Sequence, residues 1–104
     1  MSNLRKEDFT EYLEAWKSIE PTIAAAFRQR QKPMELMSKG IELLESIQAK
    51  TNEIAPVNYD ERISFIKQNI TNYSAFRQLD ELFKETEKKI ARYLILQKKK
   101  GEEQ

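Results

Sequence analysis

The chain of 104 residues contains neither cysteine nor histidine. This absence excludes disulfides and the common transition-metal sites built from thiolate and imidazole. It also excludes nucleophilic sites that pair serine or cysteine with histidine. We therefore expect no cofactor, no metal ion and no enzymatic activity.

Residues that favour turns are also scarce, since the sequence has two glycines and three prolines. A β-rich fold needs many turns, whereas the abundant Glu, Lys, Gln, Leu and Ala residues favour helices. Long apolar runs are missing as well, and the run at residues 93–96 is far too short to span a bilayer. Because the first residues, MSNLRKEDF, lack the apolar region of a secretory signal, we expect a cytoplasmic protein with no membrane partner.

Neither sign of charge dominates the composition. The 18 basic and 17 acidic side chains leave a net charge of +1, which gives no global reason to expect an anionic partner. The hydrophobic fraction of 39% is enough for a core, and the length fits one domain. We expect residues 1–104 to form a single helical domain, with residues 1–5 and 99–104 as frayed termini.

Apolar residues recur at helical spacing along most of the chain. The prolines at positions 21 and 33 are expected to separate helices, because proline suits a first turn and not a helix interior. The pattern predicts an all-α fold, a compact bundle of four or five helices with a long C-terminal helix. The expected helices cover residues 6–19, 21–31, 33–51, 59–70 and 73–98.

The loop before the fourth helix carries its own signals. Asn58, followed three residues later by Glu61, is typical of a capping box that opens a helix. Within residues 52–58, Ile54 and Val57 are expected to pack the loop onto the core.

Two short features of the helices bear on packing. The tetrapeptide AFRQ occurs at residues 26–29 and again at residues 75–78, but the flanking identities are scattered and no true repeat is indicated. We expect each phenylalanine of the pair to face the core. Trp16 is also predicted to lie in the core, and Gly40 to let another helix approach closely, in preference to marking a kink.

The apolar run at the end of the last helix departs from its surroundings. Four consecutive apolar residues cover every face of a helix, whereas the rest of this helix shows one stripe. A helix of this length also exceeds the radius of a domain of this size, so its end is expected to overhang the bundle. Cover would come from the N-terminal segment, a second copy or a partner. The alternative is that the first helix buries these residues within the monomer. The predicted interface consists of Tyr93, Ile95, Leu96 and Arg92.

Basic residues gather around the same run. Six positive charges lie between residues 88 and 100 with no acidic residue among them. Such a surface suits phosphate backbones, although a solvated helix end explains the same pattern. The predicted basic patch, next to Arg92, consists of Lys88, Lys89, Lys98, Lys99 and Lys100.

The order of several residues also resembles a known family. In the first half these residues are Trp16, Glu20-Pro21, Ile23 and Phe27-Arg28-x-Arg30. In the second half they are Pro56-Val57-Asn58, Glu61-Arg62, Tyr73, Phe76, Gln78-Leu79 and Leu82-Phe83. Together, from about residue 9 to residue 96, they resemble the YpoC-like family, small proteins of Gram-positive bacteria. The matching positions are core aromatics and caps, so the resemblance implies a fold and no catalytic residues.

These observations favour a non-enzymatic, cytoplasmic helical interaction module. It would associate with itself or bind a protein partner through the C-terminal helix. The alternative is a nucleic-acid-associated accessory protein that uses the basic end of the same helix.

Overall fold

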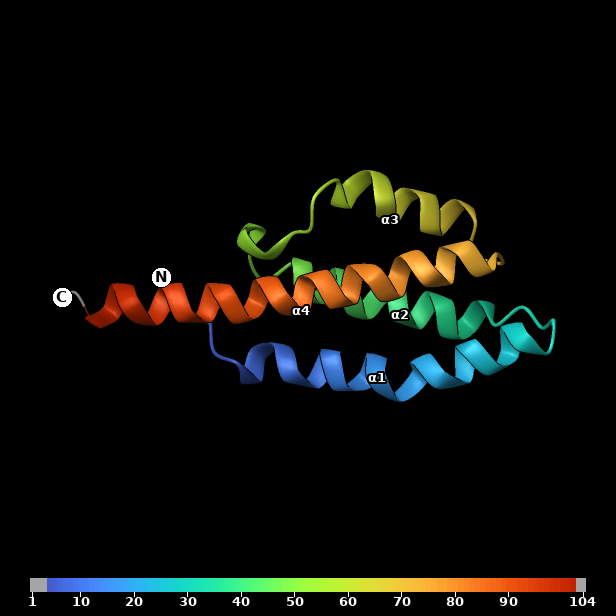
Figure 1. Cartoon of the computed structure of the whole chain (residues 1–104), viewed down its shortest axis with the longest axis horizontal. Helices are drawn as coiled ribbons and strands as arrows, with labels where there is room; N and C mark the ends of the chain where they lie inside the picture. Colours follow the sequence, from blue (N-terminus) through green and yellow to red (C-terminus); the bar gives the residue numbers. More distant parts are fainter. Residues whose placement is uncertain (1–3, 103–104) are drawn as a thin grey trace.

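The structure, a computed structural model, describes the backbone of residues 4–102 and the side chains of residues 4–99. Within this part the chain forms four α-helices and one short 3₁₀ helix (Figure 1). In chain order these are α1 (Glu7–Arg28), α2 (Met34–Gln48), η1 (Asn52–Ile54), α3 (Tyr59–Gln68) and α4 (Tyr73–Glu102). The predicted all-α bundle with a long C-terminal helix is confirmed. Fraying at both ends stays a prediction, because residues 1–3, 103 and 104 lie outside the described part.

Helix α4 organises the bundle. It contacts α1, α2, α3 and η1, and Figure 1 shows it running between α1 and α3 with α2 behind. Its inward stripe repeats every three or four residues, as a helix requires to keep one face on a core. The buried members of that stripe are Ala75, Phe76, Leu79, Leu82, Phe83, Thr86 and Ile90.

The predicted break at Pro21 is wrong, because α1 continues through this residue. Proline lacks the N–H that would bond to the carbonyl four residues earlier, and an interior proline costs about 3 kcal/mol. Trp16 and Ile23, on either side of it, are both buried, so core packing keeps the two halves in one helix. Figure 1 shows α1 bending along its middle, for which proline is a usual cause.

Helix α1 also ends earlier than the predicted boundary at residue 31. Arg30 adopts the left-handed conformation, with a φ of 61°. The N–H of Gln31 donates to the carbonyl of Ala26 at 2.9 Å, and the N–H of Arg30 donates to that of Phe27 at 3.0 Å. This is the Schellman arrangement, in which glycine usually takes the left-handed position.

The loop before α3 meets one expectation and contradicts two. Ile54 is completely buried, as predicted, whereas Val57 is 70% exposed. Asn58 precedes α3, but its φ of 57° is left-handed and its side chain makes no capping hydrogen bond. A capping side chain needs an extended backbone at that position, so the predicted capping box is wrong.

The two AFRQ segments meet in the core. The rings of Phe27 and Phe76 stack with centroids 5.8 Å apart. Phe76 is buried and Phe27 is partly buried against the same cluster, so both phenylalanines face the core as expected. The two AFRQ segments thus contribute to the same aromatic cluster, one from α1 and the other from α4.

Candidate interaction site

The apolar run at the end of α4 divides between the core and the surface. Ile90 is the last buried residue of the inward stripe, and Tyr93 and Leu94 pack half-buried against the core. Ile95 and Leu96, in contrast, are 58% and 53% exposed. Of the predicted interface residues, Tyr93 therefore faces the bundle while Ile95 and Leu96 face outward.

We call residues 92–99 the α4 tip. Within it, Arg92 precedes Ile95 by three residues and Leu96 by four, so these side chains are neighbours on the helix surface. Lys99 follows the same two residues by four and three positions. Both cations are exposed. Two apolar side chains therefore lie between two positive charges on the outward side of the tip.

The remaining predicted basic residues flank this surface. Lys88 and Lys98 are exposed, and Lys89 is half-buried. Among the side chains that the structure describes, none of these lysines belongs to an ion pair within 4.0 Å. The side chain of Lys100 lies outside the described residues.

The shape of the molecule leaves the α4 tip projecting. Helix α4 has 30 residues, which corresponds to about 45 Å. The molecule measures 55 × 25 × 18 Å, and its radius of gyration of 15.0 Å exceeds the value of about 13 Å expected for a compact domain of this size. Figure 1 shows the last turns of α4 extending past the start of α1 and past η1. The predicted overhang is confirmed.

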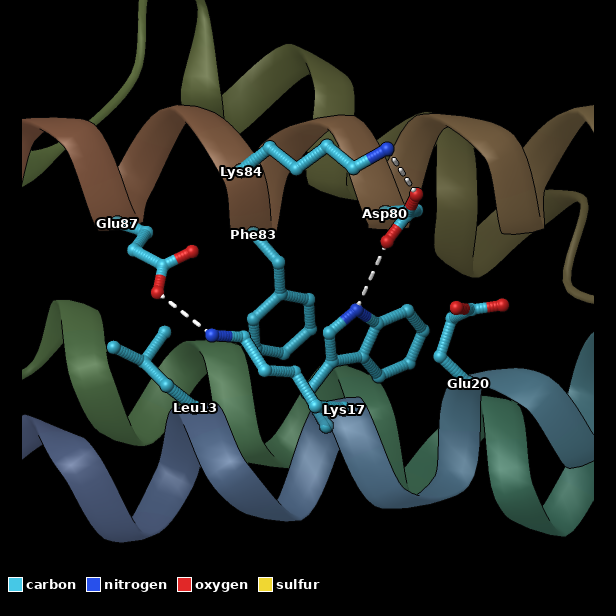
Figure 2. A pocket seen from close by; sticks show the side chains of 8 residues that line it. Leu13, Lys17, Glu20, Asp80, Phe83, Lys84 and Glu87 are labelled. Carbon is cyan, nitrogen blue, oxygen red and sulfur yellow. Dashed lines mark hydrogen bonds and ion pairs between the residues drawn. The ribbon is translucent and has the colours of Figure 1, made fainter.

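A second surface feature is a groove of about 170 Å³ between α1 and α4 (Figure 2). Trp16 lies along it, stacked on Phe83 with ring centroids 4.4 Å apart. The indole Nε1–H donates to Asp80 Oδ1 at 3.1 Å. The other carboxylate oxygen of Asp80 accepts from Lys84 at 3.0 Å.

Both ammonium groups of this groove are paired with carboxylates. Lys17 donates to Glu87 at 2.9 Å across the groove. The hydrogen bond to Glu87 raises the pKa of Lys17, and the hydrogen bond to Asp80 raises the pKa of Lys84. A general base needs a pKa near neutral, so these ammonium groups are unsuited to that role. The contacts across the groove hold α1 against α4.

Ion pairs also attach α3 to the rest of the bundle. Arg62 donates two hydrogen bonds to Glu85 of α4, of 2.6 and 2.9 Å. It also donates to the carbonyl of Val57 at 3.1 Å. The bond to Arg62 lowers the pKa of Glu85. Lys67 pairs with Glu45 of α2 at 2.6 Å. Sequence reasoning missed these pairs and the Trp16–Asp80 bond, because no local signal links residues so distant in the chain.

Comparison with known proteins agrees with the resemblance read from the sequence. Residues 6–98 match the family model described as YpoC-like protein. No curated protein and no solved structure matches the chain. In the described part of the chain, no helix is both long and apolar enough to cross a membrane.

Proposed function

The chain belongs to the YpoC-like family, and we propose that it is a non-enzymatic interaction module that binds through the α4 tip. The observation that carries the proposal is the exposure of Ile95 and Leu96 on a projecting helix end. Contiguous exposed apolar side chains usually mark an interface. Arg92 and Lys99 form the charged rim that surrounds the apolar centre of many interfaces.

The non-enzymatic and cytoplasmic parts of the proposal rest on the sequence. The whole chain lacks histidine and cysteine, and both ammonium groups of the groove at Trp16 are already paired with carboxylates. Absence of cysteine suits a reducing compartment. These observations support the proposal, and its binding role is tested by measuring association.

Crosslinking in living cells tests the binding role directly. A photo-reactive amino acid replaces Leu96 in one variant and Val57 in a matched control, since Val57 is an exposed apolar residue outside the α4 tip. We expect a discrete crosslinked product from position 96 and none from position 57. The paired substitutions Ile95→Ser and Leu96→Ser should abolish the association and leave the helical content intact. The absence of any product at position 96, or equal products from both positions, would overturn the proposal.

A nucleic-acid-associated role is the second candidate, favoured by the positive charges around the tip. Cations on phosphate backbones bind without regard to sequence, and the affinity falls steeply with salt. Lys88→Glu with Lys89→Glu should then weaken retention on duplex DNA for all sequences alike. If the wild-type chain is not retained at low salt, this candidate is wrong.

A further inference from the structure

We infer that the partner of the α4 tip is an acidic segment carrying its own apolar residues, and not a second copy of this chain. The inference rests on the proposed binding role of the tip. It comes from the charge that surrounds Ile95 and Leu96, considered together with the symmetry of protein dimers.

Along α4, the charged residues from 88 to 100 around the apolar pair are all basic. Arg92 and Lys99 lie one helical turn before and after the pair, and Lys88 lies seven residues before Ile95, on the same side of the helix. All three are exposed. From residue 88 to residue 100 the chain contains six basic residues and no acidic one. An opposing surface therefore meets positive charge on both sides of the apolar contact.

In a two-fold symmetric pairing, residues 92–99 would bring like charges together. Homodimers are most often two-fold symmetric, so the same patch of each copy faces the other. In an antiparallel pairing centred between Ile95 and Leu96, Arg92 of each copy would face Lys99 of the other. A parallel pairing would place Arg92 opposite Arg92. Like charges brought together across an interface oppose association, and two apolar residues per copy offer little to offset that repulsion.

The small apolar area also favours a partner that contributes charge. A stable protein interface buries about 800 Å² on each side, more than two side chains on one helix end supply. Opposite charge adds encounter rate and selectivity to such a contact. An acidic partner that also carries leucine or similar apolar side chains would match both the positive charge and the apolar pair of the tip. A membrane surface is a poorer match, because helices that lie in lipid carry a long apolar face. Nucleic acid leaves Ile95 and Leu96 without a role.

Two synthetic helical peptides test the inference on the full-length chain. Both carry leucine on one face, and their other positions are glutamate in one peptide and lysine in its matched counterpart. Binding is measured by fluorescence anisotropy of the labelled peptide at about 50 mM and about 300 mM salt, which bracket the range where surface charges become screened. We expect the glutamate peptide to bind, more weakly at the higher salt, and the lysine peptide not to bind.

Variants separate the two contributions to binding. Arg92→Glu should weaken the binding of the glutamate peptide by about tenfold, which corresponds to about 1.4 kcal/mol. Lys39→Glu makes the same change of charge at an exposed position of α2. It should have little effect on binding of the glutamate peptide. Ile95→Ser with Leu96→Ser should remove binding, while Val57→Ser should retain it. If the serine pair binds as well as the wild type, the apolar part of the inference is wrong.

The remaining outcomes distinguish this inference from the proposed function. Light scattering that shows a dimer, lost in the Ile95→Ser and Leu96→Ser variant, would overturn the acidic partner and leave the binding role of the tip standing. Failure of the glutamate peptide to bind would also overturn the inference, whereas the crosslink at position 96 judges the binding role separately. Tighter binding to phosphatidylserine vesicles or to duplex DNA than to the glutamate peptide would overturn it in favour of those surfaces.

Discussion

Gly40 of α2 lies directly against the indole of Trp16 in α1. A Cβ atom at Gly40 would stand 2.5 Å from Cζ3 of Trp16 and 3.0 Å from Cδ2 of Leu79 in α4. Three helices therefore meet at a position where only a hydrogen atom fits. The predicted role of this glycine, to permit close approach of another helix, is confirmed.

Substitution of Gly40 by alanine should destabilise the fold, although alanine is the better helix former. The overlap with a rigid indole ring costs about 1–3 kcal/mol, which exceeds the gain of about 1 kcal/mol in helix propensity. Urea unfolding followed by the fluorescence of Trp16, the single tryptophan, measures the difference. Ser46→Ala, at an exposed position of the same helix, is the control and should be neutral or slightly stabilising. A Gly40→Ala variant that is more stable than the wild type would show that the contact is loose.

Tyr59 at the start of α3 supplies a prediction at alkaline pH. Burial, with the negative charges of Glu45 and Asp60, raises the pKa of Tyr59 from 10.0 to about 12. Between these values the unfolded chain loses the phenolic proton and the folded chain keeps it, so the free energy of unfolding falls as the pH rises. Tyr59→Phe should reduce this alkaline loss, measured by urea unfolding near neutral pH and at about pH 11.

The same variant tests an unpaired polar atom. The hydroxyl of Tyr59 is buried and has no hydrogen-bond partner among the described residues. Its removal should leave the stability near neutral pH unchanged, or raise it by up to about 1 kcal/mol. Tyr73→Phe, at a residue that is 51% exposed, serves as the control for removal of a tyrosine hydroxyl. A marked loss of stability in Tyr59→Phe near neutral pH would indicate that the hydroxyl has a partner.

Periodicity predicted the fold because it depends on where apolar residues recur, and a single stripe along α4 specifies one buried face. The boundaries depended on weaker local preferences. Pro21 was assigned a break that packing of Trp16 and Ile23 overrides. Asn58 carried a capping signal, yet its left-handed backbone leaves the side chain unable to cap α3. Local rules fail at these places because tertiary contacts outweigh them.

The candidate site was predictable to a similar degree. The run from Tyr93 to Leu96 departs from the single stripe, and this departure in the sequence predicts outward apolar residues. Ile95 and Leu96, both predicted for the interface, are exposed, whereas Tyr93 is half-buried against the core because it belongs to the inward stripe. The bond between Trp16 and Asp80 was also beyond sequence reasoning, since it joins residues 64 positions apart.

Glu85 gives the bundle a predictable sensitivity to acid. Its hydrogen bonds to Arg62 lower its pKa below the ordinary value of 4.5. A carboxylate with a lowered pKa in the folded state contributes stability that is fully present above its unfolded pKa. That stability is lost as the pH falls from 4.5 through the lower folded value. The Glu85 side chain is 37% exposed, so solvent screening limits the contribution to at most about 1 kcal/mol.

Comparison with Glu85→Gln should expose this contribution. Near neutral pH the wild type should be the more stable protein, and the difference should shrink below about pH 4.5 and then disappear, because protonated Glu85 resembles glutamine. Urea unfolding of both proteins at several pH values measures the change. Glu42→Gln, at an exposed position of α2, should show no such convergence. A difference between wild type and Glu85→Gln that stays constant down to low pH would mean that the amide alters packing, and that the ion pair with Arg62 contributes nothing measurable.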